Sequence, residues 1–241
     1  MTSNSVKPAL YNNIVPITAE HHGDLYLDRV DNFSYTKDLG FVYVFCMEFI
    51  RAAKEYPIVF SAASGEVFPV AMLGLRNDQN VFLDDAGNWL VDYIPAYIRR
   101  YPYMLAEDPK NKGKYVMCID DTFKGLNKEG RGERLYNDDG SDGPGIEHAK
   151  SFLVTFQKNI NITSAFCKRL QELDLLVPMP KPKGARRKRV DLDGFSVIDR
   201  NRIFDLEDDK LVELMRSDDL ELIYMHMFSA NLLTYFYKKY V

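Results

Sequence analysis

The sequence has few cysteines and lacks the motifs of the common cofactor-dependent enzymes. Cys46, Cys118 and Cys167 form an odd count without paired spacing, which predicts reduced thiols in a reducing compartment rather than a disulfide framework. There is no phosphate-binding loop, dinucleotide fingerprint, paired-cysteine zinc spacing, His-Glu-x-x-His helix or Gly-x-Ser-x-Gly elbow. The common nucleotide-dependent and hydrolase classes are therefore disfavoured, and we expect no cofactor.

Long apolar runs are also missing. The first residues, MTSNSVKPALYNN, lack the apolar core of a signal peptide, and no window approaches the length of a membrane-spanning helix. We expect a cytoplasmic protein with no membrane span, while export by a route that needs no N-terminal signal stays open.

A basic excess is absent as well. The net charge of −4 disfavours a general nucleic-acid binder, which is usually basic, and we expect no DNA or RNA partner. The run from Lys181 to Arg189 is the exception, and it could hold an acidic partner, nucleic acid or an anionic lipid surface. In an acidic protein a solvated loop is the simpler interpretation.

What is present predicts an α+β fold: a single compact domain at 14–241 after a flexible N-terminus at 1–13. Aromatic and β-branched runs favour strands, expected at 13–17, 22–27, 41–45, 58–61, 114–120 and 175–179. Polar turns predict hairpins between 67–75 and 81–84 and between 190–192 and 195–198. Residues 124–145, rich in Gly, Asp and Asn, read as a long exposed loop.

Helical periodicity completes this prediction. Helices are expected at 47–56, from Asp92 to Tyr101, and at 146–173, 207–216 and 218–239. The helix from Asp92 contains Pro95 in its first turn and carries Ile94, Tyr97, Ile98 and Tyr101 on one face. The last helix is apolar on most sides, which is typical of a buried helix. We therefore expect a mainly antiparallel sheet on which the long helix and the buried C-terminal helix pack.

One block mixes aromatic rings with guanidinium groups, and it is the candidate ligand-binding surface. Its residues are Trp89, Tyr93, Arg99, Arg100 and Tyr103. Such a surface could stack on a sugar or hold an anionic group. The alternative is that the aromatic residues are core while the arginines lie along the surface with solvated heads.

Two further sets are weaker candidates. His226, with Ser229 one turn later in the last helix, could act as a base in a pocket; a structural histidine is the alternative. Asp84, Asp85, Asp120 and Asp121 end predicted strands and could converge on a hard cation. Strand ends and turns also collect Asp without any metal, so our prediction is no metal site.

The order of these segments resembles the SapC family of bacterial proteins. The matching stretches include EFIRAAKEYPIVFS, the block around YIPAYIRRYPY, the strand with CIDD, the DGFSVID segment and the closing LELIYMHMFSANL. The resemblance spans about residues 14–236. YIPAYIRRYPY and the Tyr-x-His-x-x-Ser ending are its most specific parts.

The resemblance implies an association with the bacterial surface layer (S-layer), and some members lie near genes for outer-membrane receptors. It implies no catalytic residues. The leading hypothesis is a non-enzymatic accessory or binding protein for surface assembly or uptake, with a protein, peptide or glycan partner. The rival is a cytosolic enzyme acting on a small molecule or peptide. A deep pocket holding His226 with a carboxylate would favour the rival, and a shallow aromatic groove would favour binding.

Overall fold

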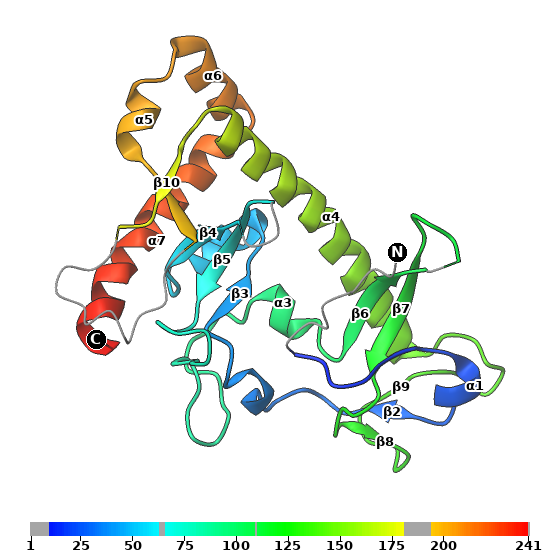
Figure 1. Cartoon of the computed structure of the whole chain (residues 1–241). Helices are drawn as coiled ribbons and strands as arrows, with labels where there is room; N and C mark the ends of the chain where they lie inside the picture. Colours follow the sequence, from blue (N-terminus) through cyan, green and yellow to red (C-terminus); the bar gives the residue numbers. More distant parts are fainter. Residues whose placement is uncertain (1–9, 63–65, 109, 181–193, 241) are drawn as a thin grey trace.

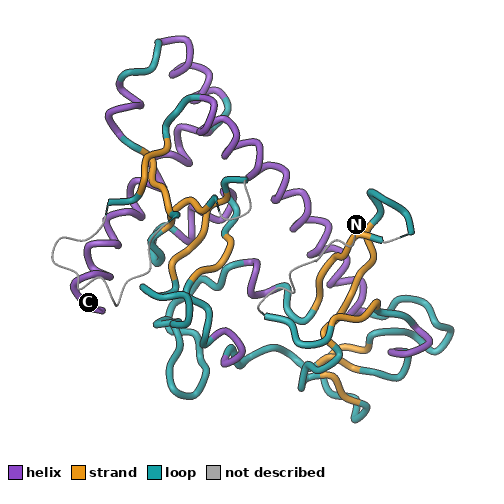
Figure 2. Tube along the Cα trace, viewed as in Figure 1, coloured by secondary structure: helices purple, strands orange, loops and turns teal. Residues whose placement is uncertain are grey.

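The strands form three antiparallel sheets in the computed structural model of the chain, which describes residues 10–62, 66–108, 110–180 and 194–240 (Figures 1 and 2). The largest sheet has the order β10-β11-β4-β5-β3. Its strands are β3 (Phe41–Tyr43), β4 (Ile58–Ser61), β5 (Phe68–Met72), β10 (Leu176–Pro178) and β11 (Phe195–Ile198).

The position of β4 in the middle of this sheet follows from its composition. Ile58, Val59 and Phe60 are all buried, so the run is apolar without alternation, as expected for a strand covered on both faces. β10 lies at the edge, where Pro178 removes no ladder hydrogen bond. The strand expected at 175–179 is therefore present as an edge strand.

The two smaller sheets each contain three strands. One is β1 (Ile14–Pro16), β7 (Tyr115–Asp120) and β6 (Tyr103–Glu107), and the other is β8 (Leu126–Asn127), β2 (Tyr26–Leu27) and β9 (Glu133–Arg134). Gly132, at φ +81°, lets β9 approach β2, because a Cβ at this position would lie 2.0 Å from the carbonyl oxygen of Leu27. β8 and β9 fall inside the predicted loop at 124–145.

The long helix α4 (Pro144–Glu172) connects the smaller sheets with the main core (Figure 1). Its first half packs Ile146 and Leu153 with Ile119 of β7, whereas Phe166 and Leu170 belong to the main core cluster. The remaining helices are α1 (Ala19–His22), η1 (Ser34–Thr36), η2 (Cys46–Glu48), α2 (Phe49–Ala52), α3 (Ala96–Arg99), α5 (Arg200–Phe204), α6 (Asp208–Arg216) and α7 (Asp219–Tyr240).

The C-terminal helix α7 packs on β4 and β11 through one face. Ile223, His226 and Leu233 are buried, while Tyr224 and Phe228 on the opposite side are exposed. Ile98 of α3 and Ile223 of α7 belong to the same core cluster. The predicted α+β class, with antiparallel sheets and both helices in one compact domain, is confirmed, but α7 buries one face instead of its whole circumference.

The predicted hairpin between 67–75 and 81–84 does not form. β5 pairs with β3 and β4 instead, and only an isolated bridge joins Leu83 to Trp89. The Val81 amide still donates to the Leu73 carbonyl at 2.8 Å, but the side chain of Asn80 in the polar turn accepts from the Phe82 amide at 2.9 Å and donates to the Thr36 carbonyl at 3.2 Å. The turn is thereby bonded to η1 instead of closing a hairpin.

The aromatic helix expected from Asp92 to Tyr101 is shorter than predicted. It consists of the single turn α3, with Pro95 as its N-cap. The amides before and at its start are held by acidic side chains: Tyr93 donates to Glu55 at 3.0 Å and Ala96 to Glu48 at 2.7 Å. These bonds favour an extended approach to the helix.

At the N-terminus, the described chain is held by β6 and β7 before residue 14. The amide of Asn12 donates to Asp120 at 2.6 Å, and the Tyr11 hydroxyl donates to the carbonyl of Tyr103 at 2.7 Å. The predicted strand at 190–192 and the basic run from Lys181 to Arg189 lie outside the described residues. No described helix combines the length and apolar character needed to cross a membrane.

Candidate functional site

A cavity of about 450 Å³ lies where α3, β2, β9 and the first turns of α4 meet. Three of the five predicted ligand-binding residues, Arg99, Arg100 and Tyr103, line it. The other lining residues are Leu27, Asp28, Arg29, Val30, Tyr101, Gly132, Glu133, Gly145, His148, Ala149, Phe152 and Leu153. We refer to it as the arginine pocket.

Arg100 is held at this pocket by aromatic rings. Its guanidinium carbon lies 4.0 Å from the centre of the Tyr97 ring and 4.8 Å from that of Phe156, a buried residue of α4. Cation–π contacts of this kind fix a guanidinium without neutralising it. The Nε atom of Arg100 is buried and has no hydrogen-bond acceptor among the described residues.

Arg99 is oriented by its main-chain and phenolic neighbours. Its Nε donates to the carbonyl of Ile94 at 2.8 Å, and one terminal nitrogen lies 3.5 Å from the Tyr93 hydroxyl. That hydroxyl donates to the buried carboxylate of Glu48 at 2.5 Å. Burial raises the pKa of Tyr93, and the charge of Glu48 raises it further. Tyr93 is therefore neutral, and its hydroxyl helps to position the Arg99 guanidinium.

Tyr103 contributes a second unused polar group. The residue is buried, and no described residue bonds its hydroxyl. Burial raises the pKa of this phenol, so it remains a neutral donor at physiological pH. Two orphaned donors at one cavity are uncommon because buried polar groups normally have partners.

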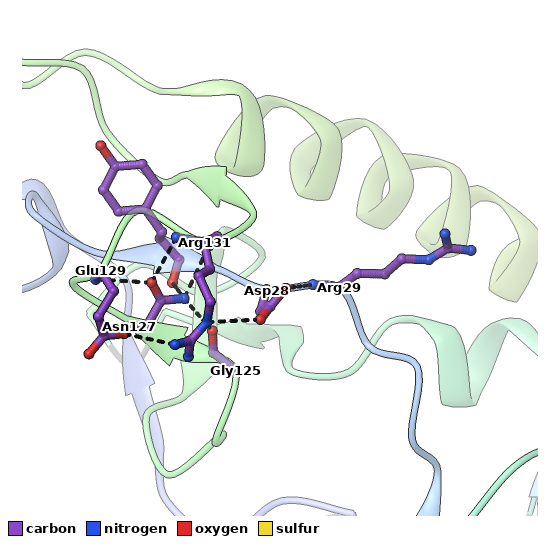
Figure 3. A network of polar contacts seen from close by, with 7 residues as sticks. Asp28, Arg29, Gly125, Asn127, Glu129 and Arg131 are labelled. Atoms are coloured by element: carbon purple, nitrogen blue, oxygen red, sulfur yellow. Dashed lines mark hydrogen bonds and ion pairs between the residues drawn. The ribbon is translucent and has the colours of Figure 1, made fainter.

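Arg29 enters the pocket from the segment after β2. Figure 3 shows its side chain extending away from the network in which Arg131 donates to Asp28 at 3.3 Å. On the opposite wall, His148 of α4 lies 3.0 Å from the Glu133 carboxylate. Both lining carboxylates are thus occupied by other partners. Within the described residues, Arg29, Arg99 and Arg100 have no carboxylate partner.

The electrostatics of the pocket favour an anionic group. Three guanidinium groups converge on it, and guanidinium binds carboxylate, phosphate and sulfate in a forked geometry. Gly145, in the first turn of α4, also lines the cavity, so the positive end of the helix dipole points the same way. Phe152 and Tyr101 supply apolar surface beside the charges.

Trp89 lies apart from this pocket. Its ring nitrogen donates to the Tyr56 hydroxyl at 2.7 Å, and Tyr56 in turn bonds the Tyr93 carbonyl. Arg29, His148 and Glu133 were not anticipated from the sequence, because they come from three distant segments without a local motif. The contiguous block Arg99–Tyr103 was the one available signal.

His226 and Ser229 do not form a nucleophile–base pair. The Ser229 hydroxyl donates to the main-chain carbonyl of His226 at 2.7 Å and accepts from the Ile58 amide at 3.2 Å, so it joins α7 to β4. The His226 ring lies against Phe60, with ring centres 5.0 Å apart. Neither ring nitrogen has a hydrogen-bond partner, and no carboxylate pairs with the ring in the part of the chain that the structure describes.

The four predicted metal candidates do not converge. Asp84 accepts hydrogen bonds from Asn88, whereas Asp120 accepts from the amides of Asn12 and Asn13. Asp121 is bonded to the side chain of Asn13, and Asp85 lies exposed in the turn after Asp84. No three His, Cys, Asp or Glu side chains within the described ranges are grouped as metal ligands.

Comparison with protein-family models matches residues 17–235 to the SapC family. No curated protein and no solved structure matches the chain. The match covers both walls of the arginine pocket, including Arg29, Arg99 and His148.

Proposed function

The chain belongs to the SapC family, and we propose that it is a non-enzymatic accessory protein that binds an anionic group of a peptide, glycan or protein partner in the arginine pocket. The association implied by the family resemblance supports a place in bacterial surface-layer assembly or uptake. A cytoplasmic location is part of the proposal.

One observation carries this function: three guanidinium groups that have no carboxylate partner among the described residues line one cavity, and two buried donors of its lining residues, Nε of Arg100 and the hydroxyl of Tyr103, have no acceptor there either. A buried donor that has no acceptor is costly unless a ligand satisfies it. A carboxylate or sulfate could accept from both orphaned donors and from the neighbouring guanidinium groups.

The cavity suits a terminal or branching group of a larger molecule. Its volume of about 450 Å³ is at the small end of ligand pockets. Arg29 and Arg99 are exposed at its rim, whereas Tyr103 is buried. The buried donors would select the anion, and the rim would contact the rest of the partner.

The test is calorimetric titration with two probes, a capped tetraglutamate peptide and a glucuronate oligosaccharide, each beside its neutral counterpart, tetraglutamine or the matching glucose oligomer. Wild-type protein should bind at least one acidic probe and neither neutral one. Arg99→Gln combined with Arg29→Gln should weaken binding by about tenfold or more, since two charge-assisted contacts are lost.

Arg76→Gln is the matched control, because Arg76 pairs with Asp78 in an exposed turn and does not line the pocket. It should leave the affinity unchanged. Equal losses in the control and in the double variant, or no binding of either acidic probe, would show the proposal to be wrong.

A further inference from the structure

A second cavity, distinct from the arginine pocket, lies between α7 and β11. Its volume is about 590 Å³. Most of its wall is apolar, and Val197, Met227, Phe228 and Leu233 are among the lining residues. Figure 1 shows α7 and β11 near the opposite end of α4 from β2 and β9, which line the arginine pocket. We refer to this second cavity as the α7 groove.

Two polar groups of the α7 groove have no partner. His226 is 1% exposed, and both of its ring nitrogens lack a hydrogen-bond partner among the described residues. The buried hydroxyl of Tyr237, three helical turns along the same face, is unpartnered too. Both residues line the groove. Because buried polar groups are almost always satisfied, these two orphans at one apolar groove are the feature from which we infer a ligand.

Two of the remaining polar residues of the groove contact other groups of the protein. The side chain of Asn231 donates to the Phe228 carbonyl at 3.1 Å. The guanidinium of Arg200 lies over the Phe204 ring, 5.4 Å from its centre. Tyr224 and Thr234 also line the groove, and both residues are exposed. The buried polar groups left to recognise a ligand are thus one imidazole and one phenol, each of which can donate to an oxygen.

We propose that the α7 groove binds a small, largely apolar molecule that carries one neutral carbonyl group, such as an acyl amide or ester, with the carbonyl oxygen accepting from His226 or Tyr237. The apolar walls hold the hydrocarbon part of the molecule. A charged head group is disfavoured because the two buried polar groups are uncharged and Arg200, which also lines the groove, already lies over the Phe204 ring.

The test uses octanamide as the probe, with octanoate as its anionic counterpart, in calorimetric titrations of the full chain. Wild-type protein should bind octanamide more tightly than octanoate. His226→Phe keeps an aromatic ring against Phe60, and Tyr237→Phe removes only a hydroxyl. The variant that removes the donor should weaken octanamide binding by about fivefold to tenfold, the loss expected for one hydrogen bond, and the other variant should leave it unchanged.

Both variants should remain folded, with unfolding midpoints equal to or above that of wild type, because each removes an unsatisfied buried group. Tyr115→Phe, an exposed tyrosine of β7, is the matched control and should leave affinity unchanged. Tighter binding of octanoate would instead assign the groove to anions through Arg200 and overturn the proposal. Failure of octanamide to bind, or binding that is unaffected in both variants, would also overturn it.

The outcome is independent of the acidic probes used for the arginine pocket, since the two cavities share no lining residue. Octanamide binding should persist in the Arg29→Gln and Arg99→Gln double variant. Its loss there would indicate a general defect of the fold and would contradict two separate sites.

Discussion

The hydroxyl of Tyr93 donates a hydrogen bond of 2.5 Å to the carboxylate of Glu48. The same carboxylate accepts from the amides of Phe45 and Ala96, each at 2.7 Å. Glu48 thereby joins the start of η2 to the segment that leads into α3. Since the Tyr93 hydroxyl also lies beside Arg99, this bond connects the main core to the wall of the arginine pocket.

Glu48→Ala should therefore destabilise the protein strongly. It leaves two buried amides and a phenol without an acceptor, at a cost of roughly 3 kcal/mol or more in the free energy of unfolding. Tyr93→Phe removes only one donor and should cost about 1 kcal/mol. Urea denaturation of both variants measures the difference. A cost below about 1 kcal/mol for Glu48→Ala would contradict the proposed role of its carboxylate.

Asp120 should make a pH-dependent contribution to the free energy of unfolding. Burial alone raises the pKa of this carboxyl, but hydrogen bonds from Asn12, Thr122 and Asn13 outweigh it, and the pKa is lowered from 3.8. Between the folded pKa and 3.8 the unfolded chain binds more protons, so stability rises with pH in that window. The contribution is complete above about pH 5 and is lost as pH falls through the folded pKa.

Asp120→Asn should then lower the free energy of unfolding by about 2 kcal/mol at pH 7. The side-chain NH2 of asparagine would face the amide and hydroxyl donors that now bond the carboxylate. The difference from wild type should shrink below pH 4. The neighbouring Asp121→Asn, at an exposed carboxylate bonded to the Asn13 side chain, is the control. Denaturation series from pH 3 to pH 7 check both, and a constant difference for Asp120→Asn across that range would exclude the linkage.

The features that the sequence predicted correctly are those that local pattern encodes. The unbroken apolar run at Ile58–Phe60 predicted the central strand β4, and apolar residues at helical spacing predicted α4 within two residues at each end. The strand expected at 81–84 failed because Asn80 bonds Thr36, a contact over 44 residues. A short stretch of sequence around the turn does not include Thr36, so the local pattern could not indicate this contact.

The candidate site likewise combines residues that the sequence indicated with residues that it did not. Arg99, Arg100 and Tyr103 are contiguous, so their composition marked them, and the fold places all three at one cavity. Arg29 and His148 come from opposite walls and are separated by more than a hundred residues. Only the β2–β9 pairing and the packing of α4 bring them together, and neither depends on a local motif.

The three cysteines should be unreactive in the native protein. Cys46, Cys118 and Cys167 are buried and free of disulfides, and burial raises the pKa of each thiol, that of Cys167 to about 12. Because the thiolate is the reactive form, modification by an aromatic disulfide reagent at pH 8 should be at least about a hundredfold slower than in denaturant.

Thr155→Cys, which places a thiol on the exposed side of α4, supplies the positive control for this measurement. One thiol should react at once in that variant, and the other three should react only after unfolding. Rapid reaction of a native cysteine would mean that its element opens frequently.

The last prediction concerns the stability of the protein in mild acid, which should depend on His226. Burial without a partner lowers its pKa from 6.5 to about 3, so between these values the unfolded chain binds a proton that the folded chain does not. Stability must then fall as pH drops below 6.5, by up to about 1.4 kcal/mol per pH unit. His226→Phe should flatten the profile between pH 6.5 and pH 4, whereas His21→Gln, an exposed histidine of α1, controls for the loss of an imidazole. An equally steep profile in His226→Phe would mean that another group causes the acid sensitivity and that the imidazole finds a partner on protonation.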